Sequence, residues 1–407
     1  MLMRRGPSVS PHPVVFLVLI TPFGVMSGYL TVALAYLLAK QGLSVEDIAS
    51  LIFVGLVPQT WKFIWAPIAD TTLTRKTWYL ISTLTSSLGL WAMGAVAAAP
   101  GSLTLLYIVV FVGSFASTFL GMTVESLLVY STPPERHGRA GGWYQAGNLG
   151  GGGIGGGIGL WLGQNLPYPA EAGAVLGVIC LLCAAGLLFV AEPPKLDRLE
   201  RYTARITRVV RDLWLLVRSR VGVLAGLICL LPIGSGAASG LWSALAGDWH
   251  ATADTVALVN GLLGGLASAL GCLVGGWGSD RIDRKTSYVI YGLLQAACAV
   301  AMALAPRTES MFILFTLAYA FISGLTYAAF SALVLEAIGL GAAATKYNVM
   351  ASLANTPIAL MTLVDGRAQT EFGTSGMLHV EALCGVAGVI VFMLIAAIRM
   401  PRVAQPT

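Results

Sequence analysis

The chain has 407 residues, of which 57% are hydrophobic and only 11% are charged, and its formal net charge is +5. A typical soluble domain carries about 25% charged residues, so the composition excludes an ordinary soluble protein and indicates one embedded in lipid. The four histidines are scattered and the six cysteines lie inside apolar runs, so we expect no metal site, no cofactor and no disulfide framework. The positive charge lies in the loops and indicates no nucleic-acid partner.

Twelve stretches are long and apolar enough to cross a membrane, since a crossing helix needs about 20 mainly apolar residues. We therefore predict an all-α membrane protein with twelve transmembrane helices in two pseudo-symmetric six-helix bundles. The first apolar run, from Val14 to Leu38, has no clear cleavage site and is expected to remain as a span rather than to be removed as a signal peptide. The predicted spans cover approximately residues 14–39, 46–69, 77–99, 103–131, 141–163, 171–191, 221–246, 254–278, 286–305, 311–338, 343–364 and 376–398.

The distribution of basic residues predicts the orientation of these spans. With the N-terminus in the cytosol, the cytosolic segments hold 20 basic residues and the opposite side holds only Lys40, Arg307 and Arg367. This asymmetry follows the positive-inside rule, so both termini are expected to be cytosolic. The remaining base, Lys62, is left within the second span.

The chain divides into two halves joined by one long cytosolic connection. Residues 192–220 carry eight basic residues among apolar ones at helical spacing, which is typical of an amphipathic helix on an anionic membrane surface. We expect an N-terminal half at 1–191, this linker at 192–220, and a C-terminal half at 221–407.

The two halves share repeated positions. Matching residues recur 207 to 211 positions apart, and parallel repeats of this kind place a solute site where the halves meet, near the middle of the membrane. The paired positions are Asp70 and Asp280, Pro22 and Pro232, Gly24 and Gly234, Glu125 and Glu336, Asn148 and Asn355, and Arg139 and Lys346.

Glycines crowd the fifth and eighth spans. The fifth has Gly147, Gly151, Gly155 and Gly159 at four-residue spacing, within a longer glycine run, and the eighth is also rich in glycine. A dinucleotide-binding fingerprint fits the first run only formally, because no strand precedes it. Glycines four apart form a smooth helix face, so we expect the two spans to meet across the interface between the halves.

The segment Gly276-Trp-Gly-Ser-Asp280-Arg281-Ile-Asp-Arg284-Lys285 follows the eighth span. Together with twelve spans in two halves, it resembles the loop motif of the major facilitator superfamily. The copy after the second span departs from that pattern, because Ala66 replaces the glycine and the bases fall one position late, which weakens the expected Asp70 latch. The resemblance implies that these loops hold the halves together and release them during transport. The implied gating residues are Asp70, Arg75, Lys76, Asp280, Arg281, Arg284 and Lys285.

Two further segments are more specific. The run from Pro58 to Asp70, Pro-Gln-Thr-Trp-Lys-Phe-Ile-Trp-Ala-Pro-Ile-Ala-Asp, resembles the second span of AmpG-type muropeptide permeases. The run from Ala344 to Asn355, Ala-Thr-Lys-Tyr-Asn-Val-Met-Ala-Ser-Leu-Ala-Asn, resembles their eleventh span. The same branch includes acetyl-coenzyme A transporters and siderophore permeases. The chain lacks room for the two extra C-terminal spans of the longer AmpG proteins.

Lys62 and Glu125 are the main candidate site residues. Each lies eight residues before the expected cytosolic end of its span, a depth of about 12 Å. A charge at that depth is costly, so it should face a wet cavity or a partner. Our hypothesis is that the two side chains face one another, that Lys62 binds a solute anion and that Glu125 carries the coupling proton. A static structural ion pair is the alternative.

Other polar and aromatic side chains inside the spans are candidates for lining the solute cavity, although each one is equally suited to bonding a neighbouring helix or to an interfacial aromatic belt. Glu336 is a second candidate proton carrier, but it is close enough to its helix end to reach the interface instead. The candidate lining residues are Gln59, Trp61, Trp65, Tyr144, Gln145, Asn148 and Asn355.

These features predict a secondary transporter of the bacterial inner membrane rather than an enzyme, with a small solute, protons and the bilayer as partners, acting as a monomer. The AmpG-like segments imply proton-coupled import of a bulky polar or anionic solute, muropeptide-like or siderophore-like. A proton-driven drug or metabolite exporter is the alternative, since composition does not reveal direction. A polytopic transferase would cluster His, Asp or metal ligands at one membrane face, and an ATP-driven pump would need a phosphate-binding loop; neither feature occurs.

Overall fold

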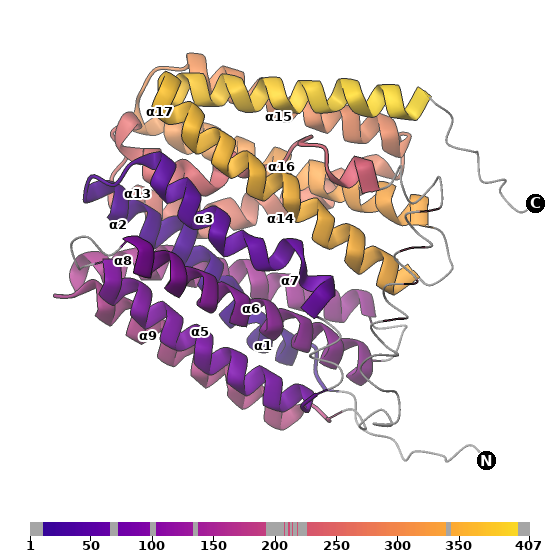
Figure 1. Cartoon of the computed structure of the whole chain (residues 1–407). Helices are drawn as coiled ribbons and strands as arrows, with labels where there is room; N and C mark the ends of the chain where they lie inside the picture. The colour runs from indigo at the N-terminus through magenta and orange to yellow at the C-terminus, as the bar shows by residue number, and fades with distance from the viewer. Residues whose placement is uncertain are drawn as a thin grey trace, which may run out of the picture.

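The fold is that of a computed structural model, which describes residues 11–65, 72–97, 103–132, 137–192, 226–338 and 343–397, and the single positions 207, 211, 214 and 218. Over these residues the chain is helical, with no strand (Figure 1). The two predicted bundles are present among the described residues: those up to 192 form the first bundle, and those from 226 onward form the second. Asp70 and all but a few residues of the predicted linker lie outside the described residues.

The helices of each bundle follow one another in the same order. In the first bundle α5 and α6 have 23 and 29 residues, and in the second α15 and α16 have 21 and 30. The elements are α1 (Val14–Gly28), η1 (Tyr29–Leu34), α2 (Ala35–Lys40), α3 (Val45–Thr60), α5 (Arg75–Ala97), α6 (Leu103–Ser131), α7 (His137–Gly153), η3 (Ile154–Ile158), α8 (Gly159–Asn165), α9 (Pro169–Cys183), η4 (Ala184–Phe189), η5 (Ala237–Leu241), α12 (Trp242–Leu245), η6 (Ala246–Trp249), α13 (Ala253–Val256), η7 (Ala257–Leu263), α14 (Gly264–Ser279), α15 (Arg284–Leu304), α16 (Glu309–Ile338) and α17 (Ala343–Ala397).

Local capping fixes where several helices begin. The Ser44 hydroxyl accepts a hydrogen bond from the backbone N–H of Asp47 at 3.1 Å, and Asp283 accepts one from the N–H of Thr286, also at 3.1 Å. Such caps satisfy N–H groups that have no partner inside the helix. Pro169 begins α9, where its missing N–H costs nothing. Polar residues in the short loops therefore determine the starts of the long apolar helices.

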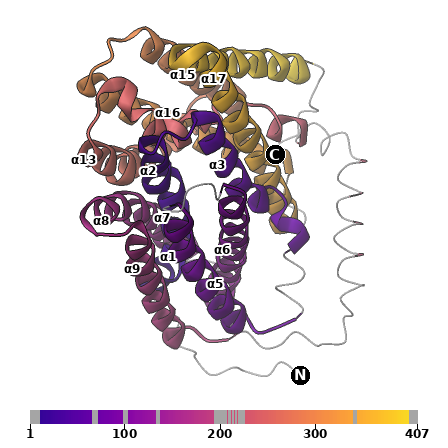
Figure 2. The same cartoon turned by 60° about the vertical axis from the view of Figure 1, so that its left-hand side comes forward.

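Among the described residues, the two bundles share a core at one end of the molecule and not at the other. We call the end where α1 begins and α17 finishes the terminal end, and the end with the connection between α2 and α3 and the bend within α17 the distal end (Figures 1 and 2). One hydrophobic cluster joins residues of both bundles, among them Leu38, Ile48, Trp249, Leu245 and Met377.

The clusters nearer the terminal end each belong to one bundle. One packs Phe16 against Leu187 and Val190 in the first bundle, and another packs Ile228 against Tyr288 and Phe392 in the second. Over the described residues, the bundles are therefore sealed together at the distal end and packed separately at the terminal end.

Eight helices among the described residues are long and apolar enough to cross a membrane, fewer than the twelve predicted spans. The spans predicted at 343–364 and 376–398 merge into α17, which turns sharply at Gly373 (φ 69°). The helix α3 has only 16 residues, the fifth span is divided among α7, η3 and α8, and the seventh is interrupted. Over the described residues, the difference lies in the continuity of these spans.

The seventh span, predicted as a continuous helix over 221–246, is broken. Residues 231–236 are not helical, and Gly234 (φ 56°) and Gly236 (φ 70°) adopt left-handed conformations that favour glycine. Pro232 removes a backbone donor at the same point. Its repeat partner Pro22 lies inside the continuous helix α1, so the repeat in sequence does not produce the same backbone.

The glycines of the fifth span have two partners. A Cβ at Gly147, Gly151 or Gly155 would overlap backbone atoms of α1, so this stripe packs inside the first bundle. A Cβ at Gly261, in η7 of the eighth span, would lie 2.6 Å from the backbone nitrogen of Gly157. The predicted meeting of the fifth and eighth spans is therefore confirmed, through a glycine outside the four-spaced stripe.

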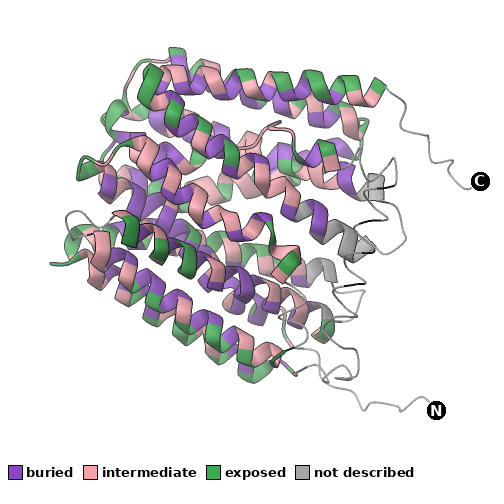
Figure 3. Ribbon diagram, in the orientation of Figure 1, coloured by how far each residue is buried: buried purple, intermediate pink, exposed green. Residues whose placement is uncertain are grey.

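The outer surface is largely apolar. Figure 3 shows exposed residues along the full length of the outer helices, and large aliphatic side chains are among the most exposed, including Leu188 (82%), Leu304 (74%) and Leu273 (72%). Contiguous apolar surface of this kind is typical of contact with lipid.

Candidate functional site

Lys62, Glu125 and Tyr144 form a polar cluster within the first bundle. Lys62 Nζ lies 3.9 Å from Glu125 Oε1, and the Tyr144 hydroxyl donates a hydrogen bond to the same oxygen at 3.1 Å. The side chains of Lys62 and Glu125 are 22% and 40% exposed. The expected juxtaposition of Lys62 and Glu125 is therefore present, and Tyr144 joins it.

Three elements position this cluster. The helix α3 ends at Thr60, and Trp61 (φ −120°, ψ 17°) interrupts it before residues 62–65 resume helical geometry. Lys62 therefore follows a helix break, whereas Glu125 lies inside the continuous helix α6 and Tyr144 inside α7. Separate helices converge on one carboxylate oxygen, so movement between them changes the environment of Glu125.

The other predicted lining residues have different surroundings. Trp61 is 52% exposed, and Trp65 packs edge-on against Phe115 with ring centroids 5.2 Å apart. Asn148 donates to Gln145 on its own helix at 3.4 Å, and Gln145 is exposed. Gln59 and Asn355 are half-buried, in α3 and α17 respectively.

Two predicted residues have no described side chain. Glu336 lies near the end of α16, but its side chain is outside the described residues, as is that of Lys346. Asp70 is outside them entirely.

Arg75 and Lys76 contact their own bundle. Their backbone N–H groups donate to the two oxygens of Glu192, at 2.8 Å for Arg75 and 3.0 Å for Lys76. Arg75 Nε also donates to the Ser126 hydroxyl at 3.1 Å, and Lys76 Nζ donates to the Leu187 carbonyl at 2.7 Å. These bonds tie the start of α5 to α6 and to the end of the sixth span.

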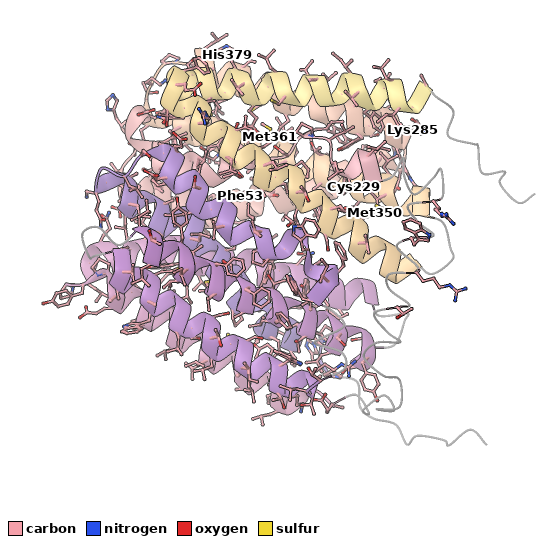
Figure 4. All side chains as sticks on the ribbon, viewed as in Figure 1. Phe53, Cys229, Lys285, Met350, Met361 and His379 are labelled. Carbon is pink, nitrogen blue, oxygen red and sulfur yellow. The ribbon has the colours of Figure 1, made fainter. Side chains whose placement is uncertain are left out.

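The predicted gating loop of the second bundle lies at the terminal end. Arg281 stacks over the Trp277 ring, 3.8 Å from its centroid, and Asp280 is exposed. Arg284 and Lys285 occupy the first turn of α15. Figure 4 places Lys285 and His379 at opposite ends of the molecule, with Met361 between them.

Sequence reasoning missed a second acidic site. Asp365 and Glu381, on the two limbs of α17, are 0% and 6% exposed, and the Tyr319 hydroxyl donates a hydrogen bond to Glu381. Asp365 falls one residue beyond the predicted eleventh span, so the sequence places it in the following loop. Glu381 lies inside the predicted twelfth span, and an acidic residue there was the signal that could have revealed it.

Neither acidic site has the donors of a metal centre. No group of three or more His, Cys, Asp or Glu side chains within the described part of the chain is arranged to hold a metal ion. What the Lys62 cluster offers is one cation, one carboxylate and one hydroxyl, which suit anion binding and proton exchange.

Comparison with known proteins gives a consistent pattern. The family model of the Major Facilitator Superfamily matches residues 14–364, whereas no curated protein matches the sequence. Among solved structures, the nucleoside transporter NupG is similar with a TM-score of 0.72 and 12% identity, over 94% of this chain and 98% of that one. A D-xylose-proton symporter is similar with a TM-score of 0.71 and 14% identity, over 94% and 96%. At such identities the likeness of the structures concerns the fold.

Proposed function

The chain belongs to the major facilitator superfamily, and on that premise we propose that it is a proton-coupled secondary transporter that imports a bulky polar or anionic solute by alternating access. The two bundles would rock about the interface between them and expose one site to each side in turn. The state that is closed at the distal end requires a core shared by the bundles there and separate cores at the terminal end, and this is the arrangement of the hydrophobic clusters.

The observation that carries this proposal is the cluster of Lys62, Glu125 and Tyr144. In our proposal Lys62 attracts the solute anion, while Glu125 takes up and releases the coupling proton. A carboxylate next to a cation favours its charged form, and it favours the neutral form when that cation is engaged elsewhere. Solute binding at Lys62 would therefore promote proton uptake at Glu125, which is the coupling that a symporter needs.

The remaining predicted roles are part of the same proposal. Trp61, Trp65, Gln59, Gln145, Asn148 and Asn355 would line the solute path, and Glu336 would be a further proton carrier. The charged loops around Asp70 and Asp280 would gate the terminal end. Arg75 and Lys76 would belong to the same gate through their charges, while their described contacts anchor α5 within the first bundle.

We further propose that the protein resides in a bacterial inner membrane as a monomer with both termini cytosolic, so that the terminal end faces the cytosol. The basis is the 20-to-3 distribution of basic residues. The proposed domain boundaries are 1–191, 192–220 and 221–407, with the long basic connection at 192–220 as the linker between the halves.

For the solute we favour a muropeptide-like or siderophore-like molecule, on the AmpG-like segments at 58–70 and 344–355. A nucleoside and the pentose D-xylose are included as further test solutes, because the similar solved structures are named as a nucleoside transporter and a D-xylose-proton symporter. A proton-driven exporter of drugs or metabolites is the second candidate, and it would use the same cluster in the opposite direction.

The test is uptake into liposomes containing the purified protein, with and without an inward proton gradient. The labelled probes are an anhydro-muropeptide, a ferric siderophore, a nucleoside and D-xylose, each applied to the wild type and to the Glu125→Gln variant. Glu371→Gln is the matched control, since Glu371 is exposed and pairs with Arg367 at 2.9 Å. Gradient-driven uptake of either favoured probe that Glu125→Gln alone abolishes would support the proposal.

Other outcomes are equally informative. Uptake of only the nucleoside or the pentose would replace the proposed solute class. Accumulation driven by a gradient of opposite sign would support export. Solute movement that ignores the gradient would remove proton coupling and leave a facilitator.

A further inference from the structure

The two limbs of α17 carry a pair of acidic side chains at matching depth. Asp365 lies eight residues before the turn at Gly373 and Glu381 lies eight residues after it, so both are about 12 Å from the distal end along their helices. Asp365 is fully buried and Glu381 is 6% exposed. The two carboxyl groups interact electrostatically. This pair lies in the second bundle and is separate from the Lys62 cluster.

Several oxygen atoms of this pair and its surroundings lack a hydrogen-bond donor. Both carboxylate oxygens of Asp365 and Oε2 of Glu381 are buried without a hydrogen-bond partner. Gln295, 3% exposed, donates to the Ser323 hydroxyl at 3.0 Å, but its Oε1 is also unpartnered. All four of these atoms are acceptors, so the arrangement lacks donors.

A small cavity lies against Glu381. Gln295 and Ser235 line it, together with Pro232 and Gly234 from the broken part of the seventh span, and its volume is about 10 Å³. That is close to the space that one water molecule needs. Non-helical backbone at membrane depth is tolerated where it is buried in protein or lines a cavity, and discontinuous helices commonly surround ion and proton sites. The break in the seventh span therefore lies where its non-helical backbone lines this cavity.

No described cation compensates the pair. The titratable groups that face it are Tyr319 on α16, Cys298 on α15 and Cys384 on α17, and η5 contributes the backbone amide of Ala238. From α3, the acidic residue Glu46 lies at Gly366. The base nearest in sequence, Arg367, is 71% exposed and pairs with Glu371. A buried carboxylate without a partner avoids the cost of its charge by binding a proton.

We propose that Asp365 and Glu381 form a proton-binding pair that holds at least one proton while the distal end is closed. The pair and the adjacent cavity provide the acceptors, and the proton provides the missing donor. In a protein that works as the proton-coupled transporter proposed above, the pair is a second proton site, one bundle away from Glu125. Asp365 is next to Gly366, which contacts Ala49 of the first bundle, so its proton sits beside the seal between the bundles.

The test is infrared difference spectroscopy of the full-length protein in liposomes, titrated with acid and base in the absence of solute. A protonated carboxylic acid has a carbonyl band that a carboxylate lacks. At neutral pH we expect this band in the wild type, its loss or shift in Asp365→Asn and in Glu381→Gln, and no change in Glu371→Gln. The two amide variants imitate neutral acids, so their melting temperatures should equal or exceed that of the wild type.

Three results would overturn the proposal. The first is a band that is absent in the wild type at neutral pH, or that persists unchanged in both amide variants. The second is failure of both amide variants to fold, which would show that the native pair is charged. The third is stabilisation of the wild type by sodium chloride but not by choline chloride, which would assign the site to a metal cation.

The infrared band and the melting temperatures are measured without solute, so their results do not depend on whether the proposed transport is correct. A protonated pair in a protein that moves none of the tested solutes would leave the proton site standing. Coupled transport that depends on Glu125, without the band, would leave only the first site.

Discussion

Gly366 of α17 packs directly against Ala49 of α3, and a Cβ at Gly366 would overlap the Cβ of Ala49. The two residues belong to different bundles, and both lie near the distal end. This close approach is therefore part of the seal that the bundles share. In a transporter that alternates between two open ends, such a contact has to form and break in every cycle.

Substituting Gly366 by Ala should weaken this seal. The added methyl group forces the helices apart, and overpacking of this kind typically costs about 1–3 kcal/mol. We expect a lower melting temperature and slower solute uptake. The control is Gly150→Ala in α7, because a Cβ there has no neighbour within 4 Å. The double variant Gly366→Ala with Ala49→Gly should recover part of the loss, and full activity of the single variant would show that the contact is not used.

Substituting Glu192 by Ala should destabilise the first bundle with little effect on transport. Glu192 accepts from the N–H groups of Arg75 and Lys76 and so caps α5, and the loss of a cap costs about 0.5–2 kcal/mol. Thermal unfolding and initial uptake rates of the same preparation measure the two effects. Lost uptake at an unchanged melting temperature would instead assign this contact to gating.

Several features of the fold followed from simple patterns in the sequence. Apolar runs of membrane-crossing length predicted the helices, and the depths of Lys62 and Glu125 predicted that they would face one another, because a charge inside a membrane needs a partner. The glycine content of the fifth and eighth spans predicted their contact. These inferences depend on length, polarity and residue size, which a sequence states directly.

Other features depended on tertiary contacts that the sequence does not state. Pro22 and Pro232 occupy matching positions, yet α1 continues through Pro22 while the seventh span breaks at Pro232. Gly24 is pressed against the Asn148 carbonyl of α7 and remains helical, whereas Gly234 turns left-handed beside Thr326. Asp365 lies just beyond the end that hydropathy predicts for its helix, and no acidic residue stands at the matching position of the first half to single it out.

Reversing the charge of both Asp70 and Asp280 should slow turnover more than it weakens solute binding. Helix-end charge interactions are worth about 0.3–1 kcal/mol each, so the double variant Asp70→Lys, Asp280→Lys should lower the maximal rate about three- to thirtyfold. Half-saturating concentrations should change little, because a gating residue is expected to act on the movement of the bundles and not on the bound solute. Transport that is untouched by the double reversal would remove the gating role.

Replacing Lys62 by Met should weaken solute binding. A hydrogen bond to a charged group contributes about 1.5–3 kcal/mol, so the half-saturating solute concentration should rise roughly 10- to 150-fold. Lys40→Met is the matched control, since Lys40 is exposed in the last turn of α2. If Lys62→Met changes uptake no more than Lys40→Met does, the pair with Glu125 is structural.

The central claim is that Glu125 carries the proton that moves with the solute, and proton movement itself tests it most directly. Liposomes that contain the protein and a trapped pH indicator are supplied with solute in the absence of any imposed gradient, and solute exchange is measured in parallel. We predict that solute acidifies the interior through the wild type, whereas Glu125→Gln exchanges solute without acidification. Acidification by Glu125→Gln at the wild-type proton-to-solute ratio would contradict the account.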